Sequence, residues 1–296
     1  MKALRTPDSR FENLKDYPFD PNYFMNSDEL RMHYVDEGDK GNPVVLLLHG
    51  EPTWSYLYRK MIPIFVAAGY RTLSPDLIGF GKSDKPLEQG DYSYDNHLQW
   101  LQEWLDELRL ERIHLFCQDW GGLLGLRLLA NQPEKFEKVV ASNTFLPIGR
   151  GPVSQAFLKW QTFAAKTPNL DIGRIVQQGS ATELSPETIA AYDAPFPDES
   201  YKAGAKVFPA LVPIKETDPG ALDNQKAWEI LRTFEKPFLT LFGEFDMITK
   251  GGETYFQKMI PGAKGLDHDI LKAGHFIQED LGAELAKKVS MFFQKS

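Results

Sequence analysis

Short runs of apolar residues recur along the chain and are separated by longer amphipathic segments. Residues 43–48 form a continuous apolar run that ends at His49-Gly50, which is typical of a strand buried on both faces of a parallel sheet. Strands that alternate with helices predict right-handed βαβ crossovers and an α/β fold with a doubly wound, mostly parallel sheet. The predicted strands lie at residues 30–35, 43–48, 71–74, 113–117, 139–142, 238–242 and 269–272.

This alternation stops between residues 148 and 222. The stretch has helical patterns at 155–165 and 185–192, is interrupted by several prolines, and contains no buried-strand pattern. A length of 296 residues suits one α/β core that carries an insertion. We therefore predict a helical cap at 148–222 and an α/β core formed by residues 1–147 and 223–296.

A tight strand-to-helix turn follows the predicted strand at 113–117. In α/β-hydrolases the nucleophile stands on such an elbow, with small residues two positions before and after it so that the helix can approach the sheet. Cys117 and Gly121 are those small residues, and Asp119 occupies the nucleophile position. An isolated Asp before a helix is more often an N-cap. The surrounding elbow favours the interpretation of Asp119 as a nucleophile.

An acid and a histidine follow the nucleophile in the chain order of that fold. Asp246 comes after the predicted strand at 238–242, and His275 comes after the last predicted strand. Ligand sites of parallel sheets form at the carboxyl ends of the strands, so these side chains are expected to meet. Asp246 would hold the His275 imidazole in the tautomer that leaves its other nitrogen free to act as a base. Glu244 is the alternative acid.

The loop after residues 43–48 is expected to complete an oxyanion hole. Such a hole needs two backbone N–H groups, one from the residue after the nucleophile and one from this early loop. Those residues are Trp120 and Glu51, because Pro52 has no N–H to donate.

The composition indicates which partners the protein can bind and in which cellular compartment it is expected. The net charge of −8 is spread along the sequence, which argues against nucleic acid as a partner. Cys117 is the only cysteine, so neither an intramolecular disulfide nor a Cys-based zinc cluster can form. The first residues lack the apolar stretch of a secretory signal, and no apolar run approaches the ~18 residues of a membrane span. We expect a cytoplasmic protein that has no membrane partner.

Four motifs together resemble those of the haloalkane dehalogenases. They are His49-Gly-Glu-Pro-Thr-Trp-Ser, Asp76-Leu-Ile-Gly-Phe-Gly-Lys-Ser-Asp-Lys-Pro, Gln118-Asp-Trp-Gly-Gly and Ala194-Pro-Phe-Pro-Asp. The resemblance covers nearly the whole chain. It implies an α/β-hydrolase fold and the subgroup whose acid follows the later strand, because Asp246 fills that place and Asn143 stands where another subgroup carries its acid.

The resemblance also implies a halide site made of two indole N–H groups, which are donors on a large apolar body. The family pattern places one at Trp120 and one in the cap, where Trp160 is the best match. The alternative is that Trp160 belongs to an ordinary apolar helical stripe. Another subgroup binds halide through an Asn at the position of Glu51, whose ionised side chain would repel the ion if it faced the site. An apolar pocket lining is expected from Phe157, Phe163, Phe196 and Phe208.

The implied reaction hydrolyses a carbon–halogen bond without a metal or organic cofactor. Asp119 would displace the halide and form an alkyl ester, and His275 would activate water to hydrolyse that ester to a primary alcohol. A small halogenated alkane, water and a halide ion are the expected partners. An epoxide hydrolase that uses the cap residues Tyr192 and Tyr201 is the alternative enzyme. A non-catalytic binding protein on the same fold is a third hypothesis.

Overall fold

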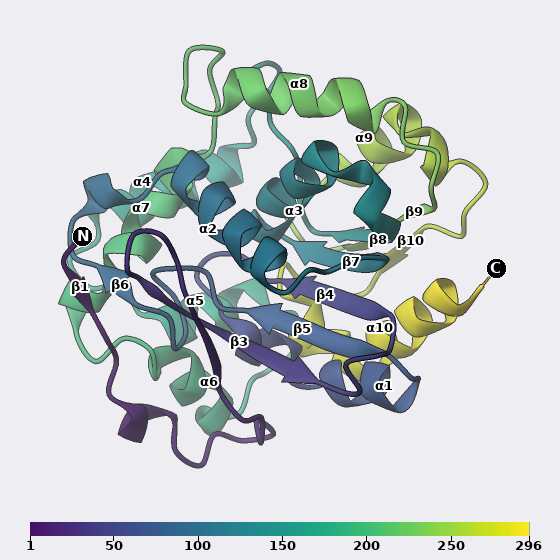
Figure 1. Cartoon of the computed structure of the whole chain (residues 1–296). Coiled ribbons are helices and arrows are strands. Elements are labelled where there is room, and N and C mark those ends of the chain that lie inside the picture. The colour runs from purple at the N-terminus through teal and green to yellow at the C-terminus, as the bar shows by residue number, and fades with distance from the viewer. Residues whose placement is uncertain (296) are drawn as a thin grey trace.

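The computed structural model describes residues 1–295, which form an eight-stranded sheet between two layers of helices (Figure 1). The strand order is β10-β9-β8-β7-β4-β5-β3-β2, and six neighbouring strands from β10 to β5 pair in parallel. The parallel strands are β4 (Val44–Leu48), β5 (Arg71–Pro75), β7 (Ile113–Gln118), β8 (Phe136–Ser142), β9 (Phe238–Gly243) and β10 (Asp269–Leu271). The predicted fold class is therefore confirmed.

The sheet is mixed at one edge. There β3 (Arg31–Glu37) pairs antiparallel with β5, and β2 (Asn22–Met25) pairs antiparallel with β3. Each of the seven predicted strands is present, with ends within three residues of the prediction. The edge strand β2 and the short pair β1 (Ala3–Leu4) and β6 (Lys85–Pro86) were not predicted. They are too short for an apolar period to stand out.

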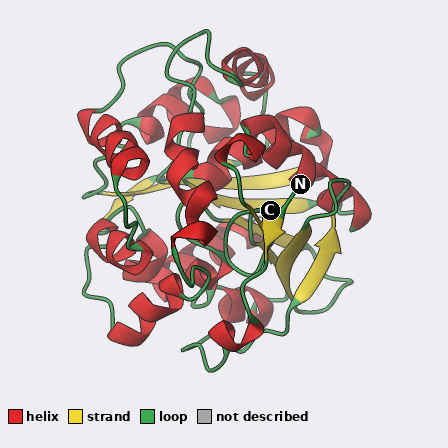
Figure 2. Cartoon of the chain, turned by 90° about the vertical axis from the view of Figure 1, so that its left-hand side faces the viewer, coloured by secondary structure: helices red, strands yellow, loops and turns green. Residues whose placement is uncertain are grey.

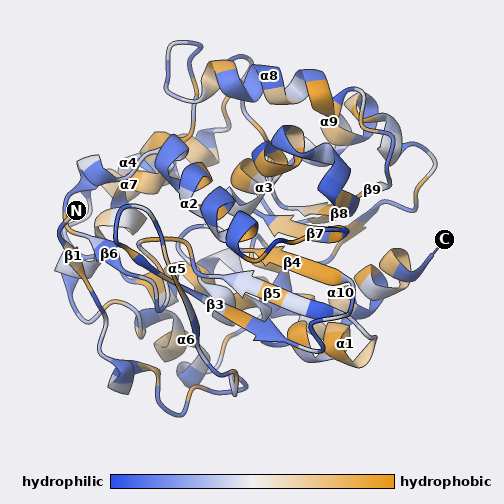
Figure 3. Cartoon of the chain, in the orientation of Figure 1, coloured by the Kyte–Doolittle hydropathy of each residue, from blue (hydrophilic) through white to orange (hydrophobic). Residues whose placement is uncertain are grey.

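Helices cover both faces of the sheet, which is why the central strands are apolar throughout. On one face α10 (Ile277–Gln294) packs on β8 and on α1 (Ile62–Ala67). On the other face α3 (Trp120–Asn131) packs on β4, β7 and β8. The apolar β4 lies between these layers in Figure 3, and all five of its residues are buried. The second face is completed by α2 (Tyr94–Glu107), α8 (Ala221–Leu231) and α9 (Gly252–Met259).

Residues 148–222, all of which the structure describes, contain helices and loops and no strand. Their main helices are α4 (Gln155–Lys166), α5 (Ile172–Gly179), α6 (Pro186–Asp193) and α7 (Ala203–Leu211). α4 packs on α7, and α5 packs on α6. In Figure 2 red helices surround the yellow strands, and in Figure 1 the pair α4 and α7 lies at the upper left, with α5 and α6 below it. The exact limits of the cap remain a prediction.

Short 3-10 helices occupy several of the connections. They are η1 (Asp8–Phe11), η2 (Ser55–Tyr58), η3 (Gln89–Asp91), η4 (Pro133–Lys135), η5 (Glu199–Lys202) and η6 (Pro261–Ala263). Within residues 1–295, we find no helix with the length and apolar character that a membrane crossing requires.

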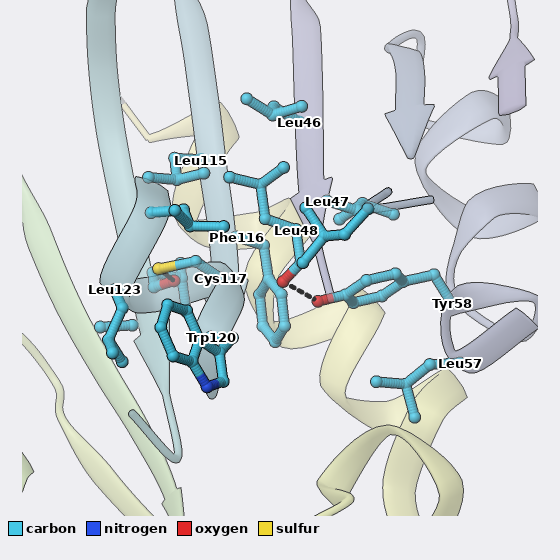
Figure 4. Close-up of a cluster of buried hydrophobic side chains, with 14 of the residues drawn as sticks. Leu46, Leu47, Leu48, Leu57, Tyr58, Leu115, Phe116, Cys117, Trp120 and Leu123 are labelled. Carbon is cyan, nitrogen blue, oxygen red and sulfur yellow. Dashed lines mark hydrogen bonds between the residues drawn. The ribbon is translucent and has the colours of Figure 1, made fainter. Parts of the chain in front are cut away.

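A cluster of buried hydrophobic side chains supports the end of the sheet where the candidate catalytic residues lie (Figure 4). The Tyr58 hydroxyl donates a hydrogen bond of 2.7 Å to the carbonyl oxygen of Leu48, the last residue of β4. Phe116 and Trp120 lie at the same end of the cluster, and the indole nitrogen of Trp120 points away from it. The position of Trp120 is thus set by the rigid core.

Candidate active site

Asp119 forms the whole connection between β7 and α3, and its backbone has the unusual angles φ 51° and ψ −126°. A non-glycine residue keeps such a backbone conformation only where its surroundings hold it there. The backbone carbonyl oxygen of Asn143 accepts a hydrogen bond from the backbone N–H of Asp119 (3.0 Å), and the Thr144 hydroxyl donates to the Asp119 carbonyl oxygen (2.7 Å). A Cβ atom at Gly121 would lie 2.0 Å from the Leu48 carbonyl oxygen, so only glycine allows α3 to start this close to β4.

Asp119, His275 and Asp246 meet at the carboxyl ends of β7, β10 and β9. His275 Nε2 lies 3.6 Å from Asp119 Oδ2, and His275 Nδ1 lies 3.1 Å from Asp246 Oδ2. Asp246 also accepts the Ile248 N–H (2.8 Å) and the Thr249 hydroxyl. The side chain of Glu244, the alternative acid, is exposed. The imidazole therefore stands between two carboxylates.

These charges control the protonation of His275. Burial lowers the pKa of His275, but the carboxylates of Asp246 and Asp119 outweigh this effect and raise it to about 10. For Asp246, burial would raise the pKa, but His275 and the Thr249 hydroxyl hold it below its usual range. In this state the imidazole carries a proton at neutral pH.

Glu51 and Gly50 bring the loop after β4 against Asp119. The Glu51 N–H donates to Asp119 Oδ1 at 2.8 Å. A Cβ atom at Gly50 would lie 2.2 Å from that oxygen, so the approach requires glycine. Trp120 is the first residue of α3, and the first N–H groups of a helix have no partner inside it. Of the two N–H groups predicted for an oxyanion hole, that of Glu51 thus contacts the Asp119 carboxylate.

The Glu51 side chain is only 4% exposed and lines the cavity. Burial raises the pKa of this carboxyl well above its usual range, and the charge of Asp119 raises it further. Burial beside Asp119 therefore favours the neutral form of this carboxyl. This shift weakens the repulsion of a halide that the sequence led us to expect of an ionised Glu51 side chain.

A cavity of about 1150 Å³ opens above Asp119. Trp120 and Trp160 both line it, as do His275 and Asp246. Trp160 comes from α4, so the cavity lies between the sheet and residues of the predicted cap. The two candidate halide donors thus line the same cavity as the candidate nucleophile.

Two of the four predicted lining residues belong to this cavity and two do not. Phe157 and Phe163 of α4 line it, whereas the prediction for Phe196 and Phe208 was wrong. The Phe208 ring is fully buried and packs against the ring of Trp120, with 4.8 Å between centroids. Phe196 is also buried and lies beside Lys85, whose Nζ is 5.9 Å from its ring. Both rings lie in the packed interior rather than on the cavity surface.

Two polar residues hold the His275 loop in place, a role that the sequence reasoning did not assign to them. Asn143 Nδ2 donates to the carbonyls of Gly274 (2.9 Å) and His275 (2.8 Å), and its Oδ1 accepts the Gly243 N–H (2.7 Å). Gln118 Nε2 donates to the His275 carbonyl oxygen at 3.3 Å and lies 3.0 Å from His275 Nε2, which can accept from it only when that ring nitrogen is unprotonated. The sequence signalled these contacts only by position, since Asn143 comes directly after β8 and Gln118 directly before Asp119.

The tyrosines required by an epoxide hydrolase do not face the cavity. Tyr192 is buried, and its hydroxyl donates to Glu279 Oε1 at 2.5 Å. Tyr201 is also absent from the cavity wall within residues 1–295, where Tyr255 is the one tyrosine. A pair of cap hydroxyls is therefore not placed to protonate an opening epoxide ring.

The chain is similar over nearly its whole length to known proteins. Residues 43–280 match the model of the alpha/beta hydrolase fold family. The chain is 54% identical to a haloalkane dehalogenase of Psychrobacter cryohalolentis, over 99% of this chain and 98% of that protein. It is 50% identical to one of Mycobacterium marinum, over 98% and 99% respectively. The tetrameric haloalkane dehalogenase DpaA from Paraglaciecola agarilytica NO2 superposes with a TM-score of 0.90 at 38% identity, over 97% of both chains.

Proposed function

The chain belongs to the haloalkane dehalogenases, hydrolases of carbon–halide bonds on the α/β-hydrolase fold, and we propose that Asp119 is its nucleophile. The observation that carries the proposal is the placement of Asp119, whose carboxylate faces the cavity between the Glu51 N–H and the His275 imidazole. A carboxylate can displace a halide from an sp3 carbon without first losing a proton to a base. The carbon–halogen bond breaks, an alkyl ester forms on Asp119, and the halide leaves with the bonding electrons.

The leaving halide is bound by the indole N–H groups of Trp120 and Trp160 in this proposal. Both residues line the cavity above Asp119. Aligned donors stabilise a negative charge most strongly where water is excluded, because the local dielectric is low. The raised pKa of the buried Glu51 carboxyl favours its neutral form, which reduces the repulsion of a halide bound beside it.

The ester is then hydrolysed with His275 as the base. Alkylation removes the charge of Asp119, one of the two carboxylates that keep His275 protonated. The imidazole can then release its proton and take one from water, while Asp246 still holds Nδ1. Water attacks the ester carbonyl, and the N–H groups of Glu51 and Trp120 stabilise the oxyanion. The sum of both steps converts haloalkane and water into primary alcohol, halide ion and a proton.

Two further parts of the proposal concern the substrate and the cellular location of the enzyme. The spread negative charge and apolar cavity support a small halogenated alkane as the partner in place of nucleic acid. The single cysteine, Cys117, is buried, which is consistent with the proposed cytoplasmic location.

Replacing His275 tests the proposed division into two steps. In His275→Phe, displacement should proceed and hydrolysis should stop, so the protein should release about one bromide per active site from 1-bromobutane. Intact-mass measurement should show a retained butyl group, and proteolytic mapping should place it on Asp119. His268→Phe is the matched control, because His268 bonds to Thr240 and to the Ala263 carbonyl outside the cavity and should turn over normally.

Other outcomes would contradict the mechanism. An adduct on a residue other than Asp119 would assign the nucleophile elsewhere. A folded His275→Phe protein that releases no bromide would mean that His275 takes part in the displacement. Halide quenching of tryptophan fluorescence in the variant shows whether the Trp120 and Trp160 site is still formed.

A further inference from the structure

The end of α5 touches the backbone of the catalytic histidine directly. The carbonyl oxygen of Gly179 accepts hydrogen bonds from the backbone N–H groups of His275 (2.7 Å) and Phe276 (3.3 Å). A Cβ atom at Gly274 would lie 2.3 Å from the same oxygen, so the two chain segments meet at closer range than any side chain at Gly274 would allow. Residues 179–182 and the His275 loop therefore form one contact.

A single carboxylate, that of Asp280, binds both sides of this contact. Its Oδ2 accepts the N–H groups of Ala181 (3.0 Å) and Gly274 (2.8 Å). Its Oδ1 accepts the N–H (2.8 Å) and the hydroxyl (2.7 Å) of Thr182. Asp280 lies in the first turn of α10, so the donors come from residues 181–182, from the His275 loop, and from no part of its own helix.

The opposite side of His275 is fixed by the core. Its carbonyl oxygen accepts Asn143 Nδ2 at 2.8 Å, and Asn143 is also bonded to Gly243 of β9. The N–H of His275 is thus bound by residue 179 and its carbonyl by the sheet. The distance of 3.6 Å between the imidazole and Asp119 depends on both attachments.

We propose that Asp280 is a positioning residue that couples the α5–α6 connection to His275 and thereby controls the rate of ester hydrolysis. The inference rests on the proposed function, in which His275 acts only in the second step. It predicts that loosening the contact leaves the displacement of halide unchanged, because Asp119 is held separately by Asn143, Thr144 and the Glu51 loop. The alkyl ester should then accumulate.

Asp280→Asn is the sharpest perturbation. Each oxygen of Asp280 accepts two hydrogen bonds. The amide of Asn has almost the same shape as the carboxylate, but in either orientation its NH₂ group would replace one of these oxygens and face two donors. Charge-assisted bonds to backbone N–H groups are lost on one side of the contact. A displacement of a catalytic group by about 1 Å can cost roughly a hundredfold in rate. We expect ester hydrolysis to slow by about ten- to a hundredfold.

The experiment measures both steps in rapid-quench single turnovers of 1-bromobutane. Bromide release reports displacement, and intact mass reports the ester on the protein. Asp280→Asn should show a bromide burst at the wild-type rate followed by slow loss of the ester. Asp198→Asn is the matched control, because Asp198 likewise accepts a backbone N–H and a hydroxyl, both from Ser200 in η5, and should behave as wild type.

His275→Phe, run beside these variants, separates the two proposals. If it forms no ester, the proposed function fails, and the inference fails with it. If it forms a stable ester while Asp280→Asn hydrolyses at the wild-type rate, only the inference is overturned. Equal slowing of bromide release and ester loss in Asp280→Asn would likewise overturn it, since that pattern reflects general distortion.

A second variant covers the case in which Asp280→Asn does not fold. Thr182→Val keeps the backbone N–H and removes the hydroxyl that donates to Asp280 Oδ1. It should slow ester hydrolysis severalfold with an unchanged burst. A wild-type rate of ester loss in Thr182→Val would then overturn the inference.

Discussion

Removing the charge of Asp119 should lower the pKa of His275, and this can be measured without any substrate. The substitution Asp119→Asn keeps the shape of the side chain and abolishes its charge, as alkylation does in the proposed mechanism. The imidazole would keep its second carboxylate, Asp246, at 3.1 Å. The variant therefore reports how much of the raised pKa of His275 is due to the charge of Asp119 alone.

The expected size of the effect follows from the geometry. The closest charged atoms of Asp119 and His275 are 3.6 Å apart, and their side chains are only 18% and 11% exposed. Coulomb's law gives about 1 kcal/mol at this distance in water and about 4 to 5 kcal/mol at the effective dielectric constant of a protein, which is an upper bound. One pKa unit corresponds to about 1.4 kcal/mol. We expect the pKa of His275 to fall from about 10 by roughly one to three units.

The same charge links stability to pH. The pKa of His275 is about 10 in the folded protein and 6.5 in the ordinary imidazole, so the folded state binds the proton more tightly. The resulting stabilisation is complete below pH 6.5 and is lost as the pH rises to about 10. It amounts to at most about 5 kcal/mol. In Asp119→Asn the contribution should be smaller and should be lost at a lower pH.

Two measurements check this prediction. Histidine NMR titration gives the pKa of His275, whose signal is identified by its loss in His275→Phe. Denaturant unfolding across the same pH range gives the dependence of stability on pH. The reasoning would be refuted if His275 titrated at the same pH in Asp119→Asn and wild type, or if the wild-type residue titrated near 6.5.

Two further variants test the halide site and the acid. Trp160→Phe keeps an aromatic ring and removes one donor, which should slow bromide release by roughly a hundredfold, or about 3 kcal/mol. Trp228→Phe should leave this step unchanged, because its N–H donates to the Leu146 carbonyl at 2.8 Å, so equal bromide release by both variants would remove Trp160 from the site. Asp246→Asn should favour the wrong imidazole tautomer and slow ester hydrolysis by about 10⁴-fold, whereas Glu244→Gln should be mild because Glu244 is exposed. The reverse order in ester-decay rates would transfer the role of the acid to Glu244.

The strands and the elbow could be predicted from the sequence because both depend on local patterns. An apolar run of five residues buried on both faces, such as β4, indicates a parallel strand wherever it occurs. Cys117, Asp119 and Gly121 identify the elbow by spacing alone, since the close approach of a helix to a strand demands small residues at fixed positions. The relative places of Asp246 and His275 followed from the rule that strand ends of a parallel sheet share one edge.

The tertiary structure decided the features that depend on contacts between distant segments. Phe196 and Phe208 are aromatic residues of the predicted cap like Phe157, yet they pack into the interior and do not line the cavity. The raised pKa of Glu51 arises from burial beside Asp119, which no local pattern encodes. Asp280 meets Ala181 across 99 residues of sequence. Periodicity describes which face of an element is buried, but the partner on that face and the electrostatic environment it creates are determined only when the whole chain is packed.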